Sequence, residues 1–551
     1  YLKEEDAEWH DILLCINTGK LVDDDDRFRM TTDQLHLKSP QEMADTFSDY
    51  PDAIENTVEI AEKCDVELDD SRKYPSFSID EHGEETNFDY LQRITREGLE
   101  ERHGELTDEM EERLEYELDV IDQMGYVDYF LITWDFVRFA EDEGIPVGMR
   151  GSGGGSLVAH ALGLSDLNPL DYDLLFERFL DPERREPPDI DIDLCELRRG
   201  DVIDYVKDKY GQNSTAQIIT FGRLFARNCI RDVGRVLDVP LSKVDKLAKS
   251  VPAGPGVTLE DALEESSELR ETEDEETQRI LKFAQELEGL PRHASTHAAG
   301  VVIADQDLWE LIPVCCNTDQ ERMTQWDMED LEDMGMLKMD FLGLRTFTII
   351  DRTLDVIERA GKERPSLAVN DVDLQDPETY KLLARGEGKG VFQLGSGGMQ
   401  ELLKRLEPSN FEELIAVLAL YRPGPLQSGM VEDFIDRKHG RAEVDYPHPS
   451  FEPVLKPTYG VILYQEQIMR ILNNIAGMSM ANALTMIKAI SKKKEKVIKK
   501  GHEDFVEGAI NHGGLERDTA EEIYQLIEHF AGYGFNKAQD RKSTRLNPVT
   551  V

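Results

Sequence analysis

The sequence lacks three features that would each place it in a familiar class of protein. It has no run of about 18 consecutive apolar residues, and no signal-peptide pattern opens the chain. Its six cysteines show no CxxC spacing, so neither a disulfide framework nor a zinc site follows from them, and we expect buried, reduced thiols. We therefore predict a soluble, cytoplasmic protein with no membrane partner.

Positive charge is also scarce. The chain has 62 Lys and Arg residues against 113 Asp and Glu residues, for a net charge of −51. Taken alone, this balance argues against nucleic-acid binding, because the phosphate backbone attracts Lys and Arg. Two interpretations stay open. Either the acids form a hydrated surface suited to high salt and local basic patches bind nucleic acid, or the partner is not nucleic acid.

The length of 551 residues suggests several domains. Apolar spacing typical of helices runs through 53–63, 106–125 and 129–144, through most of 199–290, and again after 351. A segment with Pro and Gly at 74–85 is a candidate boundary. Because the chain begins at Tyr1 rather than Met and ends in the polar tail QDRKSTRLNPVTV, we expect a sequence truncated at both ends.

Three acids, Asp189, Asp191 and Asp193, alternate with apolar residues in PPDIDIDLCE (187–196). This period-2 pattern predicts a strand with the carboxylates on one face. Like charges about 7 Å apart repel there by roughly 2 kcal/mol at an effective dielectric of 20. An EF-hand loop counted from Asp189 fails, because its sixth position, which needs Gly, holds Leu194 and its twelfth, which needs Glu, holds Gly200. A solvated edge strand remains possible, but the close spacing favours a divalent-cation site.

One further acid, Asp340, lies inside the apolar run KMDFLGL (338–344). On a strand it shares a face with Lys338, two residues before it. A buried Asp is costly unless it is paired or bound to metal. Its structural partner would be Lys338 or Arg345, and its functional partner a metal shared with Asp191 and Asp193.

The segment RGSGGGS (150–156) also has two interpretations. Gly/Ser runs commonly serve as flexible linkers. Here, however, the run leads directly into the apolar helix LVAHALGL, where glycines allow close approach of the backbone and helical N–H groups are available to phosphate. No GK[ST] sequence closes it, so it is not a Walker A motif.

Two weaker signals lie further along the chain. His293 and His297, spaced i, i+4, would suit zinc on a helix, but no Glu follows His293 as in the HExxH proteases. A lysine cluster is most simply a solvated helix face, yet in so acidic a chain it is the best electrostatic footprint for phosphate. Its members are Lys488, Lys492, Lys493, Lys494, Lys496, Lys499 and Lys500.

Together these segments resemble the C-family polymerases, the alpha subunits of bacterial replicative DNA polymerase III. The resemblance spans roughly residues 1–538 and implies an α+β multidomain fold. This fold has a polymerase-beta-like nucleotidyltransferase palm, a helical thumb, fingers and the tail of a PHP domain. The matching segments, in the family's order, are RGSGGGSLVAHAL, LLFERFLDPER, PDIDIDL, QIITFGRL, IRDVGRVL, HASTHAAGVVIA, KMDFLGLRT, VFQL, YRPGPLQSGMV, ILYQEQIM and FAGYGFNK.

The same resemblance implies domain limits. The expected domains are 1–75 for the C-terminal part of the PHP domain, 76–222 and 303–350 for the palm, 223–302 for the thumb, 351–538 for incomplete fingers, and 539–551 for a tail outside the family.

The implied function is DNA-directed DNA synthesis in chromosomal replication. The reaction is a two-metal transfer of a deoxynucleotide to the primer 3′-hydroxyl with release of pyrophosphate. Asp191, Asp193 and Asp340 match the family's catalytic carboxylates, which hold two Mg²⁺ ions, while Asp189 is expected to support them. The implied phosphate-binding residues are Arg150, Gly151, Ser152, Gly155, Ser156, Arg178, Lys338, Lys488, Lys492 and Lys493, and the implied DNA contacts are Lys494 and Arg422.

The expected partners are primed template DNA and dNTPs and, for the full-length protein, the sliding clamp, clamp loader and proofreading subunit. Two rival hypotheses remain. A two-metal phosphoesterase or nuclease would use similar carboxylates on water, and a non-catalytic fragment would only bind primed DNA or replisome partners. The motifs YRPGPLQSGM and FAGYGFNK favour the polymerase, since a hydrolase has no need of them.

Overall fold

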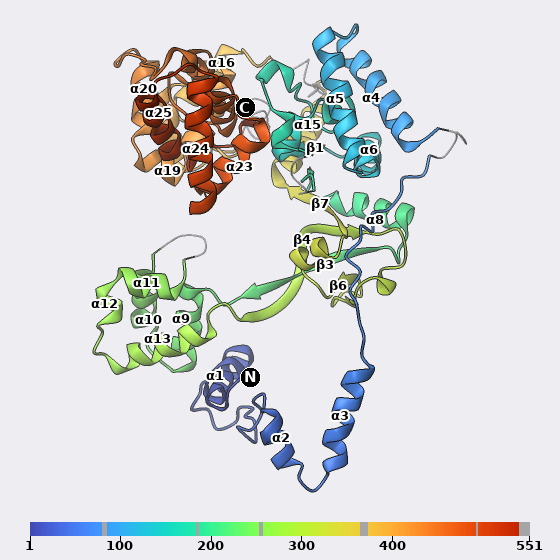
Figure 1. Cartoon of the computed structure of the whole chain (residues 1–551), viewed down its shortest axis with the longest axis vertical. Helices are drawn as coiled ribbons and strands as arrows, with labels where there is room; N and C mark the ends of the chain where they lie inside the picture. Colours follow the sequence, from blue (N-terminus) through green and yellow to red (C-terminus); the bar gives the residue numbers. More distant parts are fainter. Residues whose placement is uncertain (80–84, 183–186, 253–256, 364–372, 492–493, 539–551) are drawn as a thin grey trace. The chain divides into compact units, whose positions relative to one another are not determined.

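A computed structural model describes residues 1–79, 85–182, 187–252, 257–363, 373–491 and 494–538 (Figure 1). The protein is an α+β structure whose chain divides into two compact units, each assembled from segments far apart in the sequence. The first unit comprises Tyr1–Arg72, Ala216–His297 and Leu311–Met336. The second comprises Lys73–Thr215, Ala298–Glu310 and the chain from Leu337 onward.

Within the described residues, seven strands follow the order β1-β2-β7-β4-β3-β6-β5 in a mixed sheet. In the second unit, β2 pairs in parallel with β7 and antiparallel with β1, and β4 pairs antiparallel with β7. In the first unit, β6 pairs in parallel with β3 and antiparallel with β5. The strands are β1 (Val147–Arg150), β2 (Asp191–Cys195), β3 (Thr215–Arg223), β4 (Pro291–Ile303), β5 (Val314–Cys316), β6 (Arg322–Thr324) and β7 (Leu337–Leu344).

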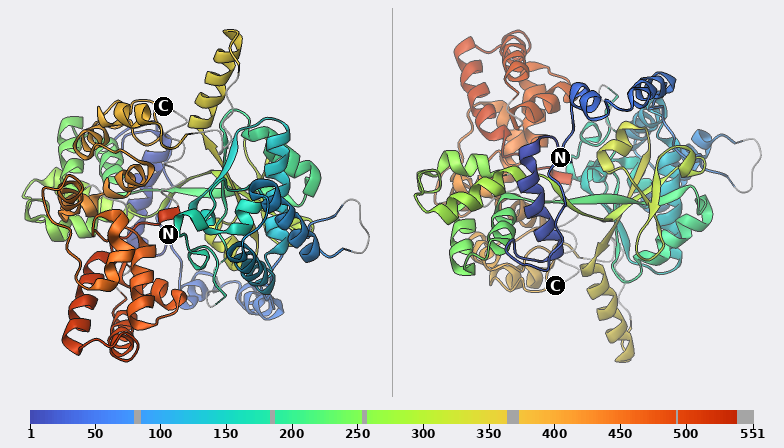
Figure 2. Two further views of the ribbon diagram at one scale, coloured as in Figure 1. Left: turned by 90° about the horizontal axis from the view of Figure 1, so that it is seen from above. Right: turned by 90° about the horizontal axis from the view of Figure 1, so that it is seen from below.

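The first unit is built on a helical core. Figure 2 shows α1 beside the helices that follow β3, and residues such as Ile12, Ile230 and Phe283 are buried among them. Its helices are α1 (Ala7–Thr18), α2 (Pro40–Thr46), α3 (Pro51–Lys63), α9 (Ala226–Val236), α10 (Leu241–Ser250), α11 (Leu259–Glu265), α12 (Ser267–Arg270), α13 (Glu275–Leu287) and α14 (Met328–Asp333).

In the second unit, helices cover one face of β1, β2 and β7. Ile192 and Leu194 of β2 are buried in this core, and the rings of Phe136 and Phe341 lie 4.8 Å apart within it. Since side chains alternate across a strand, the acids of β2 must point to the opposite face. The covering helices are α4 (Asn87–His103), α5 (Asp108–Gln123), α6 (Val127–Asp142), α7 (Leu157–Ala161) and α8 (Arg199–Tyr210).

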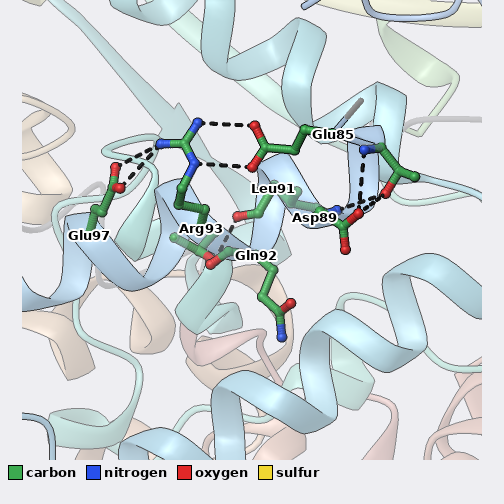
Figure 3. A network of polar contacts seen from close by, with 8 residues as sticks. Glu85, Asp89, Leu91, Gln92, Arg93 and Glu97 are labelled. Carbon is green, nitrogen blue, oxygen red and sulfur yellow. Dashed lines mark hydrogen bonds and ion pairs between the residues drawn. The ribbon is translucent and has the colours of Figure 1, made fainter. Parts of the chain in front are cut away.

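The beginning of α4 shows how local sequence sets a helix end (Figure 3). Thr86 accepts a hydrogen bond from the backbone N–H of Asp89, whose carboxylate accepts one in return from the Thr86 hydroxyl. One turn later, Arg93 pairs with Glu85 at 3.1 Å and with Glu97 at 3.2 Å. The hydrogen bonds between Thr86 and Asp89 define the start of the helix. The ion pairs of Arg93 lie at the surface and therefore contribute only modestly to stability.

Beyond β7 the second unit is helical, as the apolar spacing predicted. Two clusters of buried side chains organise this region, one around α17, α18 and α20 and the other around α22 to α25. The helices are α15 (Arg345–Arg359), α16 (Pro377–Ala384), α17 (Gly397–Leu406), α18 (Phe411–Leu420), α19 (Pro423–Gln427), α20 (Met430–Lys438), α21 (Glu452–Leu455), α22 (Gln465–Ala476), α23 (Met480–Ser491), α24 (Glu495–Asn511) and α25 (Arg517–Ala531).

Residues 199–290 are mainly helical, as expected, and β3 interrupts the helices from Thr215 to Arg223. The structure corrects two local expectations. The acid-bearing strand begins only at Asp191, so Asp189 precedes it, and Pro187 and Pro188 have no N–H to donate to a ladder. His293 and His297 lie on β4 instead of a helix, so they lack the i, i+4 helical arrangement on which the zinc interpretation depended. Among the described residues, no helix has the length and apolar character needed to cross a membrane.

Candidate metal and nucleotide site

Strand β2 lies between two partners that bring functional groups to it from distant parts of the chain. Arg150, the last residue of β1, is the cross-strand partner of Asp191 on one side. Asp340 of β7 is its partner on the other. The sheet therefore places a cation and two carboxylates side by side, although Asp191 and Asp340 belong to widely separated segments.

Asp189, Asp191 and Asp340 form a cluster in which each residue offers a carboxylate oxygen within 4.8 Å of the others. Asp340 is buried, Asp191 is half-buried and Asp189 is exposed. Carboxylate oxygens at this spacing are the ligands that Mg²⁺ and similar hard cations prefer. The cluster therefore has the chemistry of a divalent-cation site, with Asp189 in the place where the sequence predicted Asp193.

The pKa values of two acids of the cluster, Asp189 and Asp191, are raised. Loss of hydration is the largest effect on Asp191 and, with the charges of Asp189 and Asp340, raises its pKa to about 6. Burial also raises the pKa of Asp189, and Asp340 adds to that shift while Lys338 opposes it. A bound cation would reverse this balance, because its charge favours the ionised carboxylates.

Asp340 itself has one satisfied and one unsatisfied oxygen. Its Oδ2 atom pairs with Lys338 Nζ at 2.8 Å, which is the structural partner that the strand pattern suggested. Its Oδ1 atom is buried and accepts no hydrogen bond from the residues that the structure describes. A buried oxygen without a donor is costly, and it suits a ligand atom for a cation.

Asp193 occupies a different position from the one expected. It is buried and forms an ion pair with Arg150, while Asp189 joins the cluster instead. The parallel register explains this difference, since Asp193 lies opposite Leu342, two residues beyond Asp340. The role of Asp193 as a metal ligand therefore stays a prediction.

The glycine turn (residues 150–156) follows β1 and reaches the cluster at its first glycine. Gly151 has a φ of +85°, and a Cβ there would lie 3.5 Å from Asp191 Oδ2. A Cβ on Gly153 would meet Met149, and one on Gly155 would lie 2.8 Å from the Leu175 carbonyl oxygen. Packing against backbone therefore requires the glycine at 155, whereas at 153 the end of the Met149 side chain would have to move.

The far end of the glycine turn is closed to solvent. Ser156 is fully buried and caps α7 by accepting a hydrogen bond from the Ala159 N–H. The N–H groups of Leu157 and Val158 donate to the buried carboxylate of Glu117 on α5. These helical N–H groups, which the sequence suggested for phosphate, are thus already bonded, and phosphate binding by Gly155 and Ser156 stays a prediction.

Glu117 was not among the functional residues predicted from the sequence, although the apolar pattern of α5 marks it as a buried acid. The apolar face of α5 carries Leu114, Leu118 and Ile121, all buried. Glu117 falls on this same face, and an acid on an apolar stripe needs partners inside the protein.

Two other predicted basic residues form contacts elsewhere in the described part of the chain. Arg178 donates through Nε to Gln465 Oε1 at 3.0 Å. Arg422 donates to the carbonyl groups of Ala419 and Tyr533 and lies over the ring of Phe535. Their phosphate and DNA contacts stay predictions.

The lysine cluster is described only in part. Lys488 is half-buried on α23 and Lys494 is exposed before α24. Lys492 and Lys493 lie outside the described residues.

Two family models match the chain. The bacterial DNA polymerase III alpha NTPase domain matches residues 89–343. The bacterial DNA polymerase III alpha subunit finger domain matches residues 346–513. Together they include β1, β2, β7 and most of the helices that follow.

Curated relatives extend the similarity to nearly the whole chain. The DNA polymerase III subunit alpha of Pseudomonas aeruginosa is 47% identical over 561 residues, which cover 98% of this chain and 48% of the relative. The subunit of Escherichia coli K12 is 45% identical, and the match covers 98% of this chain and 48% of that relative. The subunit of Campylobacter jejuni is 43% identical, and the match covers 98% of this chain and 47% of that relative. The chain thus spans about half the length of these relatives.

Proposed function

Because the chain belongs to the family of bacterial DNA polymerase III alpha subunits, we propose that it catalyses DNA-directed DNA synthesis. It adds a deoxynucleotide to the 3′-hydroxyl of a primer and releases pyrophosphate. The observation that carries this proposal is the pairing of Asp191 with Asp340 across β2 and β7, beside a buried Asp340 oxygen that none of the described residues bonds.

The residues present suit Mg²⁺, because the cluster offers only oxygen ligands. Asp191 and Asp340 would hold two ions together with Asp193, which is buried two residues further along β2. When bound, Mg²⁺ would lower the pKa of the primer 3′-hydroxyl and neutralise charge on the triphosphate and the leaving pyrophosphate. Asp189, at the exposed edge of the cluster, supports this charge balance.

Arg150 and Lys338 are the cations nearest these acids. The Nε atom of Arg150 is buried and donates no hydrogen bond to the residues that the structure describes, so the guanidinium can take another acceptor. Arg150 would exchange the Asp193 carboxylate for a phosphate oxygen and so free Asp193 for metal. Lys338 would hold the triphosphate from the Asp340 side. Gly151 and Ser152, at the open end of the glycine turn, would bring backbone N–H groups to the same phosphates.

The same proposal gives the elements their roles. The palm comprises residues 76–222 and 303–350, including β1, β2 and β7. Helices α9 to α13 form the thumb, α16 to α25 the fingers, and residues 1–75 the tail of a PHP domain. Arg178, Lys488, Lys492 and Lys493 would complete the phosphate contacts, and Lys494 would contact DNA.

The partners are primed template DNA and dNTPs in the cytoplasm. In the longer protein they include the sliding clamp, the clamp loader and the proofreading subunit.

Extension of a labelled primer annealed to a template tests the proposal, with Mg²⁺ and the four dNTPs present and Asp191→Ala as the control. We expect extension by the wild-type chain and none by the variant, with DNA binding retained. Shortening of the primer without dNTPs would instead identify a phosphoesterase or nuclease. Inactivity of both proteins with retained DNA binding would identify a non-catalytic fragment.

A further inference from the structure

The buried carboxylate of Glu117 collects four hydrogen bonds at one end of the glycine turn. Arg113 donates to it from Nε at 2.6 Å, and the Ser156 hydroxyl donates at 2.8 Å. The N–H groups of Leu157 and Val158 donate at 2.9 and 3.0 Å. All four partners are donors, which favour the ionised carboxylate and oppose the effect of burial, which raises the pKa of Glu117.

The same arginine also bonds the turn directly. Arg113 donates from Nη2 to the carbonyl oxygen of Gly155 at 2.9 Å. Arg113 and Glu117 are one helical turn apart on α5, so a single helix supplies both groups. Arg113 therefore links the acid that binds α7 to the last glycine of the turn.

The glycine turn is consequently held at both ends by different elements. At its start, Arg150 is paired with β2, and Gly151 approaches the Asp191 carboxylate. At its end, Gly155 and Ser156 are bonded to Arg113 and to the acid on α5. A short segment with several glycines has many accessible conformations, so holding both ends limits where its first residues lie.

We propose that Glu117, bound to Arg113, is a positioning residue that sets the glycine turn for the phosphates of the incoming nucleotide. This inference rests on the proposed polymerase function. Glu117 touches neither the acid cluster nor the predicted phosphate ligands at the start of the turn, so it acts through the backbone of the turn. A charged hydrogen-bond network around a fully buried carboxylate is also sensitive to loss of that acceptor.

The alternative is that Glu117 only stabilises α7 as a buried helix cap. Glu413 on α18 provides a matched control for that alternative. It is also buried, accepts hydrogen bonds from the Ser409 N–H and the Tyr459 hydroxyl at 2.7 Å, and pairs with Lys438 at 3.3 Å. Glu117→Gln and Glu413→Gln thus make the same change from acid to amide in similar buried networks, but only the first network includes the glycine turn.

The experiment compares wild-type protein, Glu117→Gln, Glu413→Gln and Arg113→Lys at a temperature where thermal melting shows all four to be folded. Amide hydrogen exchange is followed for the peptide containing residues 150–158. Single-nucleotide incorporation on primed DNA gives kcat and the KM for dNTP. Calorimetric binding of dATP with Mg²⁺ measures the same site without catalysis.

We expect Glu117→Gln to speed exchange at 150–158 about tenfold and to raise the KM for dNTP about tenfold, with a smaller change in kcat. Glu413→Gln should leave both quantities within twofold. Arg113→Lys, which keeps the charge but not the fork that reaches Gly155, should raise KM by an intermediate factor. Unchanged exchange in Glu117→Gln would overturn the proposal, and so would faster exchange with a KM equal to that of Glu413→Gln.

Failure of the polymerase proposal is separable from failure of this one. If the wild-type chain extends no primer, the polymerase proposal fails and dATP affinity replaces KM. A tenfold weaker affinity in Glu117→Gln than in Glu413→Gln then supports the positioning role, and equal affinities overturn it.

Discussion

Asp191 lies directly opposite Asp340 on the neighbouring parallel strands β2 and β7. Two carboxylates at this spacing repel one another, and the half-buried setting of Asp191 strengthens the repulsion. A fold selected for stability alone would have little reason to keep this pair. The pairing instead suits a site in which bound cations turn repulsion into attraction.

Replacing Asp340 should separate stability from function. In EDTA, we expect Asp340→Asn to change the unfolding temperature little, because the like-charge repulsion that it removes is offset by loss of the ion pair with Lys338. With Mg²⁺, wild type should gain thermal stability and the variant should not. Primer extension should fall by a factor of about 100 or more. Asp208→Asn, an exposed acid on α8, controls for the change in net charge. A Mg²⁺-dependent gain in the variant equal to that of wild type would contradict the metal site.

The pKa of Asp191 predicts a pH dependence for the metal-free protein. Its folded-state pKa of about 6 lies above the usual value near 4. The folded state therefore holds this proton more tightly, and the resulting stability is full below about pH 4 and is lost as pH rises through about 6. In EDTA, wild type should lose melting temperature relative to Asp191→Asn between about pH 4 and pH 6. Parallel curves for the two proteins would refute this expectation.

Substitution of Arg422, which was predicted to bind DNA, tests whether its side chain stabilises the fold instead. Its two hydrogen bonds to carbonyl groups and its position 4.3 Å over the Phe535 ring predict that Arg422→Gln costs about 1–3 kcal/mol of stability. The salt dependence of DNA binding should then be unchanged. The exposed Lys494 is the matched comparison, since Lys494→Gln should reduce the slope of log K against log salt by about 0.9. A reduced slope in Arg422→Gln would show a phosphate contact.

The charge of −51 predicts that salt stabilises this protein. Self-repulsion among surface acids destabilises the compact state, and salt screens it within about 3 Å at 1 M. The melting temperature should rise by several degrees between 0.1 and 2 M KCl, and primer extension should persist at molar salt. A maximum of both at ordinary ionic strength would rule out adaptation to high salt.

Much of the local structure followed from the sequence. The apolar period predicted α5 and α6, and the Gly-rich run was expected to lead into the helix that became α7. The family resemblance, drawn from ordered motifs, is confirmed by the two family models and the relatives. These predictions succeeded because helical periodicity and short motifs are local properties of the chain.

The register between strands β2 and β7 could not be predicted from the sequence. The motif favoured Asp193 as the partner of Asp191 and Asp340, whereas the structure gathers Asp189 with them and pairs Asp193 with Arg150. A shift of two residues in the pairing of β2 with β7 would change which acid faces Asp340, and nothing local in either strand sets that shift.

The sequence by itself therefore determined the identity of the acids, the glycine turn and the family to which they belong. Only the tertiary structure decided which acids meet and that Glu117 occupies the N–H groups of α7. The reason is physical. Residue type and spacing set what a segment can do, but the contacts between distant strands and helices depend on packing across the whole core.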